Sequence, residues 1–192
     1  MSKQETVCKN AENCFLAKHG TKSWDIVKRI LLTFFKPPIR ILDLTYGTGR
    51  FYKSLDRSIL TITAVDVEKH KWEVEPNVFY QMRAQEFVNK VIGKSIELGE
   101  IDVVVVDPPW DALKRGKIKY NIRLAARPYR FSENPESIIN AALLIVKSLG
   151  KPLMYKYMRV IECKHKALWI SEIKIFGNKG YNYYGLCVDW KE

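Results

Sequence analysis

Val103-Val104-Val105-Val106-Asp107-Pro108-Pro109-Trp110 decides the fold of this 192-residue chain. A β-branched apolar run without alternation is typical of a strand buried on both faces of a parallel sheet. The two prolines end the strand abruptly, because neither has a backbone N–H. Asp107 is therefore expected at the carboxyl end of a central strand, where ligands bind in open α/β sheets.

The four residues after the valine run suit a planar group that bears an exocyclic amine. The Asp107 carboxylate and the Pro108 carbonyl can accept the two amine hydrogens, and Trp110 can stack on the ring. An amine held in this way has its lone pair aimed at an electrophile. The alternative is structural: an Asp-Pro turn at a strand end, followed by a core tryptophan.

A second strand, predicted at 39–44, runs into the glycine turn Thr45-Tyr46-Gly47-Thr48-Gly49-Arg50 and a predicted helix at 51–55. Glycines let the backbone pass close to a ligand, so this arrangement is typical of a nucleotide site. The next predicted strand, 60–65, ends at Asp66, which follows Asp43 by 23 positions. An acid there can bind a ribose diol; the alternative is that Asp66 caps a helix.

In this order, I-L-D-L-T-Y-G-T-G (41–49), A-V-D-V (64–67) and V-V-D-P-P-W (105–110) resemble three motifs of class I amino-methyltransferases. These enzymes use S-adenosylmethionine (SAM) to methylate adenine or cytosine amines in nucleic acids. The resemblance implies that SAM is the cofactor and that the catalytic motif is Asp107, Pro108, Pro109 and Trp110. It implies that Asp43, Gly47 and Gly49 hold the methionine part of the cofactor and Asp66 the ribose. The predicted cofactor site also includes Thr45, Tyr46 and Gln85.

Two positions depart from the family pattern. Thr45 stands where the family loop has its first glycine, so it is expected to take an ordinary negative φ and to add a hydroxyl to the site. After the strand predicted at 78–80, the family often has an acid that binds the adenine amine. Residues 81–85 hold no acid, and Gln85 or the backbone is left to accept that amine.

The remaining pattern predicts strands at 152–158, 167–176 and 183–188, the last two joined by a turn at 177–180. Helices are predicted at 24–35, capped by Ser23, at 84–92 and from Asn134-Pro135 to Leu149. The fold class is therefore α/β: a Rossmann-like mixed, mostly parallel seven-stranded sheet with helices on both faces and a C-terminal β-hairpin.

We expect a single methyltransferase domain over 1–192. It comprises an N-terminal helical segment (1–38), a cofactor-binding half (39–106), and a catalytic motif, basic loop and C-terminal half (107–192). Neither a secretory signal nor an 18-residue apolar run is evident, which predicts a cytoplasmic protein without a membrane partner. Cys8, Cys14, Cys163 and Cys187 show no C-x-x-C spacing, so free thiols are expected rather than a metal site.

The net charge of +11 is concentrated after the catalytic motif. Residues 111–130 contain one acid, Asp111, against seven basic residues, which we call the basic loop: Lys114, Arg115, Lys117, Lys119, Arg123, Arg127 and Arg130. A basic segment beside a base-stacking tryptophan fits a strand that is held by its phosphates. The alternative is a solvated surface loop, which charge runs usually are.

The expected function is SAM-dependent methylation of an exocyclic amine in nucleic acid, most simply adenine N6 in DNA, because D-P-P-W is typical of adenine-amine enzymes. Only 82 residues follow Trp110, which leaves no separate domain to select a DNA sequence. RNA adenine or guanine methylation is therefore the alternative. A third reading is a catalytically silent nucleic-acid-binding protein with a methyltransferase-like fold. The sequence leaves the oligomeric state open.

Overall fold

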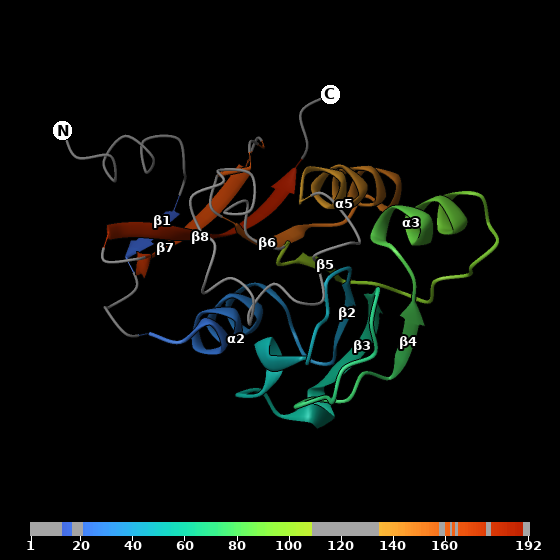
Figure 1. Ribbon diagram of the computed structural model, residues 1–192, viewed down its shortest axis with the longest axis horizontal. Coiled ribbons are helices and arrows are strands. Elements are labelled where there is room, and N and C mark those ends of the chain that lie inside the picture. Colours follow the sequence, from blue (N-terminus) through green and yellow to red (C-terminus); the bar gives the residue numbers. More distant parts are fainter. Residues whose placement is uncertain are drawn as a thin grey trace.

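The computed structural model describes residues 13–16, 21–108, 135–157, 160–161, 163, 165–175 and 178–189. Within these residues, eight strands form one sheet in the order β1-β7-β8-β6-β5-β2-β3-β4 (Figure 1). All neighbours are parallel except β8, which runs antiparallel to both β6 and β7. The strands are β1 (Asn13–Leu16), β2 (Ile39–Asp43), β3 (Leu60–Asp66), β4 (Val78–Gln81), β5 (Val103–Val106), β6 (Leu153–Tyr157), β7 (His165–Ile175) and β8 (Asn178–Asp189).

Helices cover both faces of this sheet. Helix α2 (Ser23–Phe34) packs on one face, and α3 (Ala84–Ile92) and α5 (Pro135–Leu149) pack together on the other, as Figure 1 shows. Two short 3₁₀ helices, η1 (Arg50–Tyr52) and η2 (Arg57–Ile59), connect β2 to β3. The predicted Rossmann-like fold with a C-terminal hairpin of β7 and β8 is confirmed.

The valine run explains why two cores form. All four residues of β5 are fully buried: Val103 and Val105 pack in the core under α2, and Val104 and Val106 pack under α5. Alternate residues of a strand point to opposite faces, so a strand between two helical layers must be apolar at every position. Strand β5 therefore lies in the middle of the molecule and fixes the position of Asp107.

All seven predicted strands are present, and β1 adds an eighth at the edge beside β7. Two predictions about helices were wrong. The chain after the glycine turn forms the 3₁₀ turn η1, not a helix over 51–55, and Leu55 lies beyond it. Ser23 does not cap α2; its hydroxyl shares a 2.8 Å hydrogen bond with the hydroxyl of Tyr184 in β8.

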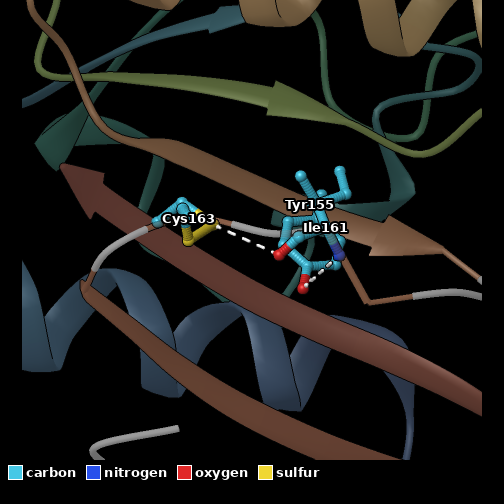
Figure 2. Close-up of a disulfide and its surroundings, with 4 residues drawn as sticks. Tyr155, Ile161 and Cys163 are labelled. Atoms are coloured by element: carbon cyan, nitrogen blue, oxygen red, sulfur yellow. Dashed lines mark hydrogen bonds between the residues drawn. A yellow bond between two sulfur atoms is a disulfide. The ribbon is translucent and has the colours of Figure 1, made fainter. Parts of the chain in front are cut away.

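The expectation of free thiols was wrong for two of the four cysteines. Cys163 and Cys187 form a disulfide, with their Cα atoms 5.9 Å apart. Figure 2 shows Tyr155 and Ile161 beside this bond, where the Ile161 N–H donates to the Tyr155 hydroxyl at 3.1 Å. The sulfur of Cys187 lies 3.9 Å from the Ile161 carbonyl oxygen. The pairing requires β8 to lie beside β6, which the spacing of cysteines along the sequence does not reveal.

None of the helices within the described residues is both long and apolar enough to cross a membrane.

Candidate functional site

A row of polar residues crosses the sheet where the parallel strands end. Asp43 pairs with Ala64 of β3 and Val105 of β5, and Val105 pairs with Met154 of β6. Two positions beyond each of these four residues, the chain has a polar residue at the same level of the sheet. Residues two apart in an extended chain point to the same face. The registers of β4 and β8 extend this polar row, which consists of Gln81, Asp66, Thr45, Asp107, Lys156 and Tyr184.

The middle of the polar row lies at the point where the strand order reverses. After β2 the chain builds outward through β3 and β4, and it then returns to place β5 on the other side of β2. In open α/β sheets ligands bind in the crevice at such a point. Thr45 and Asp107 flank it, and the N–H of Asp107 donates to the Thr45 hydroxyl at 2.6 Å.

Asp107 forms an ion pair with Lys156. The lysine Nζ lies 2.9 Å from Oδ2 of the carboxylate. The Asp107 side chain is 26% exposed and that of Lys156 is 13% exposed. Burial raises the pKa of Asp107, and the lysine charge opposes that shift. Burial alone would lower the pKa of Lys156, but the carboxylate raises it above its usual value. Among the described residues, no hydrogen bond reaches Oδ1 of Asp107.

Asp43 is buried beneath the loop and organises it from below. Its Oδ1 accepts the Thr45 N–H at 2.9 Å, and its Oδ2 accepts the Tyr52 hydroxyl at 2.7 Å. Burial raises the pKa of Asp43 to about 7, against the lowering effect of these two hydrogen bonds. Both of its oxygens thus accept hydrogen bonds from the protein, and Asp43 holds the backbone of the loop in place.

The two glycines of the turn differ in their surroundings. Both have positive φ, +56° at Gly47 and +72° at Gly49, which side chains disfavour. A Cβ on Gly49 would lie 2.6 Å from the Tyr46 hydroxyl oxygen, so this glycine is needed for packing. A Cβ on Gly47 would meet no heavy atom within 4 Å. Gly47 therefore leaves space beside the loop backbone, as the close approach of a cofactor requires.

Asp66 lies at the end of β3, with its carboxylate turned toward the same loop. Its Oδ2 accepts the Gly47 N–H at 2.7 Å, and its Oδ1 accepts the Glu68 N–H at 3.1 Å. The side chain is fully buried, and Nε2 of His70 lies 3.8 Å from Oδ1. No helix begins here, since the chain is irregular from 67 to 77, so the helix-cap alternative was wrong.

The other predicted site residues lie in different places. Tyr46 is buried and donates its hydroxyl to the Val74 carbonyl at 2.7 Å, away from Asp107. Gln85 lies in the first turn of α3, where its amide donates to Asn89 at 3.0 Å. Pro108 is buried directly after β5. Pro109, Trp110 and the whole basic loop lie outside the described residues.

Sequence reasoning missed Lys156, Tyr184 and Tyr52. Lys156 is the one charged residue in the otherwise apolar strand β6. A charge within a buried strand is costly unless it is paired, and this was the available signal. Tyr184 pairs with Lys156 in the register of β6 and β8. Within the described residues, no group of three or more His, Cys, Asp or Glu is arranged to hold a metal ion.

Comparisons with known proteins agree with this geometry at the level of fold. No protein-family model and no curated protein matches the chain. An rRNA methylase from Streptococcus thermophilus superposes with a TM-score of 0.51 and 11% identity, over 90% of this chain and 99% of that one. A putative methyltransferase from Streptococcus mutans, in complex with SAH, superposes with a TM-score of 0.50 and 11% identity, over 86% of this chain and 97% of that one.

A SAM-dependent methyltransferase from Agrobacterium tumefaciens has a TM-score of 0.46 and 12% identity over 88% of this chain. This chain spans 61% of the length of that protein. Identities this low establish a shared architecture and no more. The chain therefore has the Rossmann-like fold of the two streptococcal structures, with a row of polar residues where its parallel strands end.

Proposed function

We propose that this chain is a SAM-dependent methyltransferase that modifies an exocyclic amine of a nucleic-acid base. The observation that carries the proposal is the state of Asp107. Its carboxylate stands at the switch point of the sheet, Lys156 holds Oδ2, and no described residue occupies Oδ1. A fixed acceptor at this edge suits an amine hydrogen better than it suits a packing role.

The loop after β2 fits the proposed cofactor. Gly47 leaves open space beside the backbone, and Asp66 lies against the same loop, where a carboxylate can accept from a ribose diol. Thr45 and Tyr46 would take part through their backbone, since their hydroxyls bind Asp107 and Val74. When bound, SAM supplies an electrophilic methyl group. Gln85 remains the proposed contact to the adenine amine.

In the proposed reaction the chain's own residues bind and aim the amine. Oδ1 of Asp107 and the carbonyl of Pro108 accept the two amine hydrogens, which directs the nitrogen lone pair away from the ring. The amine nitrogen forms the new C–N bond with that lone pair, and the C–S electron pair stays on sulfur. The nitrogen then loses one proton to Asp107 or to water. In this mechanism the rate acceleration comes mainly from positioning the amine and from excluding water.

Adenine N6 in DNA is the proposed target, because D-P-P-W is typical of adenine-amine enzymes and the basic loop suits a phosphate backbone. The likeness to an rRNA methylase favours a second candidate, an adenine or guanine amine in RNA. A catalytically silent protein that binds nucleic acid is the third. A measurement of SAM binding separates the third candidate from the first two.

The deciding experiment incubates the protein with labelled SAM and separate pools of DNA, RNA and protein, and identifies the modified residue by mass spectrometry. Asp107→Ala should lower the single-turnover rate by at least about a hundredfold while SAM affinity stays near wild type. Asp107→Asn is the matched shape control: its amide oxygen is expected to accept from Lys156, which leaves an NH2 donor facing the substrate amine, so its rate should fall as well. An Asp107→Ala protein that methylates at the normal rate would overturn the mechanism.

Trp110 provides an independent test of base binding. Trp110→Ala should weaken capture of the target base by about 1 to 3 kcal/mol, because a stacking surface is lost. Trp110→Phe should recover part of that loss. The dependence of the single-turnover rate on substrate concentration distinguishes this effect from that of Asp107→Ala.

A further inference from the structure

We infer that Lys156 is a positioning residue of the proposed transfer, which holds the Asp107 carboxylate by Oδ2 and so presents Oδ1 to the target amine. This inference rests on the proposed function and adds a residue from a different strand to it. Pro108, Pro109 and Trp110 carry no charge, and within the described residues Lys156 of β6 is the cation that contacts Asp107.

The sheet itself sets the geometry of this pair. Val106 of β5 pairs with Tyr155 of β6, so the next residue of each strand, Asp107 and Lys156, lie side by side. Their contact of 2.9 Å is short and only partly open to solvent. Within the described residues, the one hydrogen bond of the lysine ammonium goes to Asp107. The ring of Phe51 also lies near the ammonium, with its centroid 5.4 Å from Nζ.

This arrangement determines what Asp107 can do. A carboxylate in a partly buried site tends to take up a proton, and a protonated oxygen donates a hydrogen bond instead of accepting one. An adjacent ammonium favours the charged form, so both oxygens stay acceptors. Because Lys156 occupies Oδ2, it also fixes the rotation of the carboxylate and leaves a single oxygen directed at the substrate.

Other titratable groups also face the pair and have to be included in any pH profile. Asp43 at the end of β2 repels the negative charge of Asp107, and Tyr52 of η1 donates to Asp43. Tyr184 of β8 lies beside Lys156 in the strand register. Each of these three residues is left unchanged in the test below.

The test compares Lys156→Met with Lys156→Arg in the full chain. Methionine keeps the length of the lysine stem but loses the charge, whereas arginine keeps the charge. Lys156→Met should bind SAM within about twofold of wild type and lower the maximal single-turnover rate about tenfold or more at neutral pH. The acid limb of its pH–rate profile should move to higher pH. Lys156→Arg should restore most of the rate, and Lys147→Met, on the exposed side of α5, should change nothing.

A second readout needs no activity. The Asp107 carboxyl carbon, followed by NMR, should titrate at higher pH in Lys156→Met than in wild type. Loss of rate without this shift, or failure of Lys156→Arg to restore the rate, would overturn the inference. If wild type neither binds SAM nor methylates any pool, the proposed function fails instead. The NMR titration then still decides whether Lys156 controls the Asp107 carboxylate.

Discussion

The backbone N–H of Asp107 donates to the hydroxyl of Thr45 over 2.6 Å, and this bond joins the end of β5 to the loop after β2. The same loop is held by Asp43, because the Thr45 N–H donates to its carboxylate. The proposed cofactor loop and the proposed catalytic acid are therefore one connected unit. A glycine at position 45, as in the family that the sequence resembles, would lack the hydroxyl that makes this connection.

Replacing Thr45 tests the connection directly. Thr45→Val keeps the shape but leaves the Asp107 N–H without its acceptor, which should lower the free energy of unfolding by about 1 to 3 kcal/mol. The Asp107 amide should also exchange faster with solvent. Urea unfolding and hydrogen exchange measure the two effects. Thr45→Ser, which keeps the hydroxyl, should stay close to wild type; equal losses in both variants would contradict the role of the hydroxyl.

Asp43 predicts an unusual pH dependence of stability. Its pKa in the folded protein is about 7, above the ordinary value of 3.8, so the folded state binds this proton more tightly than the unfolded state does. Its contribution to the free energy of unfolding should therefore fall as the pH rises from about 4 to about 7. Asp43→Asn does not titrate. The difference in unfolding free energy between wild type and Asp43→Asn, measured by urea titration from pH 4 to 8, should decrease over this window, and a flat difference would be evidence against the raised pKa.

Asp66 has a structural role in addition to its proposed role with the ribose. Asp66→Ala should weaken SAM binding by roughly 2 to 3 kcal/mol, because charge-assisted hydrogen bonds are lost. It also removes the acceptor of the Gly47 N–H. Asp66→Asn keeps one acceptor for the loop and should lose less affinity. Calorimetry checks both variants, and undiminished affinity in Asp66→Ala would remove this residue from the site.

The disulfide should contribute measurably to stability. Cys163 and Cys187 are separated by 24 positions. Closing a loop of this size lowers the conformational entropy of the unfolded chain, which should raise the free energy of unfolding by about 3 kcal/mol. The double variant Cys163→Ser/Cys187→Ser should unfold at a correspondingly lower urea concentration. In reducing buffer, the wild type should unfold at a urea concentration close to that of the double variant. The unfolding of the double variant should not change with the reductant. A reductant-independent wild type would argue against the bond.

The basic loop should make nucleic-acid binding sensitive to salt. Neutralising Lys117, Lys119 and Arg123 together should flatten the fall of log affinity with log salt, reducing the magnitude of its slope by about 2 to 3. A matched control neutralises three exposed lysines elsewhere, Lys71, Lys94 and Lys147. Fluorescence anisotropy over a range of salt concentrations measures the slope. An unchanged slope would show that these three residues of the basic loop do not contact phosphates, as in an ordinary solvated surface loop.

The sequence was sufficient to predict the strands and the acids at their ends. Strands between two helical layers have to be apolar throughout, so runs such as β5 are easily recognised. Parallel strands also end at the same edge of the sheet, and this brings Asp43, Asp66 and Asp107 together without knowledge of the strand order. The hydrophobic pattern thus determines most of the fold and the position of the candidate site.

The partners of these acids depend on details that the pattern does not contain. Lys156 meets Asp107 because β6 lies beside β5 in one particular register. Tyr52 reaches Asp43 because the chain makes a tight 3₁₀ turn after Gly49, where a helix over 51–55 was predicted. Contacts between residues far apart in the sequence require the strand order and the register, and both follow from packing in three dimensions.

The bond between Cys163 and Cys187 also makes a covalent ring of the C-terminal hairpin. The ring encloses all of β7 and most of β8. A protease that cuts once inside this ring opens it without releasing a fragment, so the two pieces stay attached. On a denaturing gel the nicked protein would run as one band without reductant and as two bands with it. Strand β7, which carries the edge strand β1, would remain tethered to the rest of the sheet after such a cut.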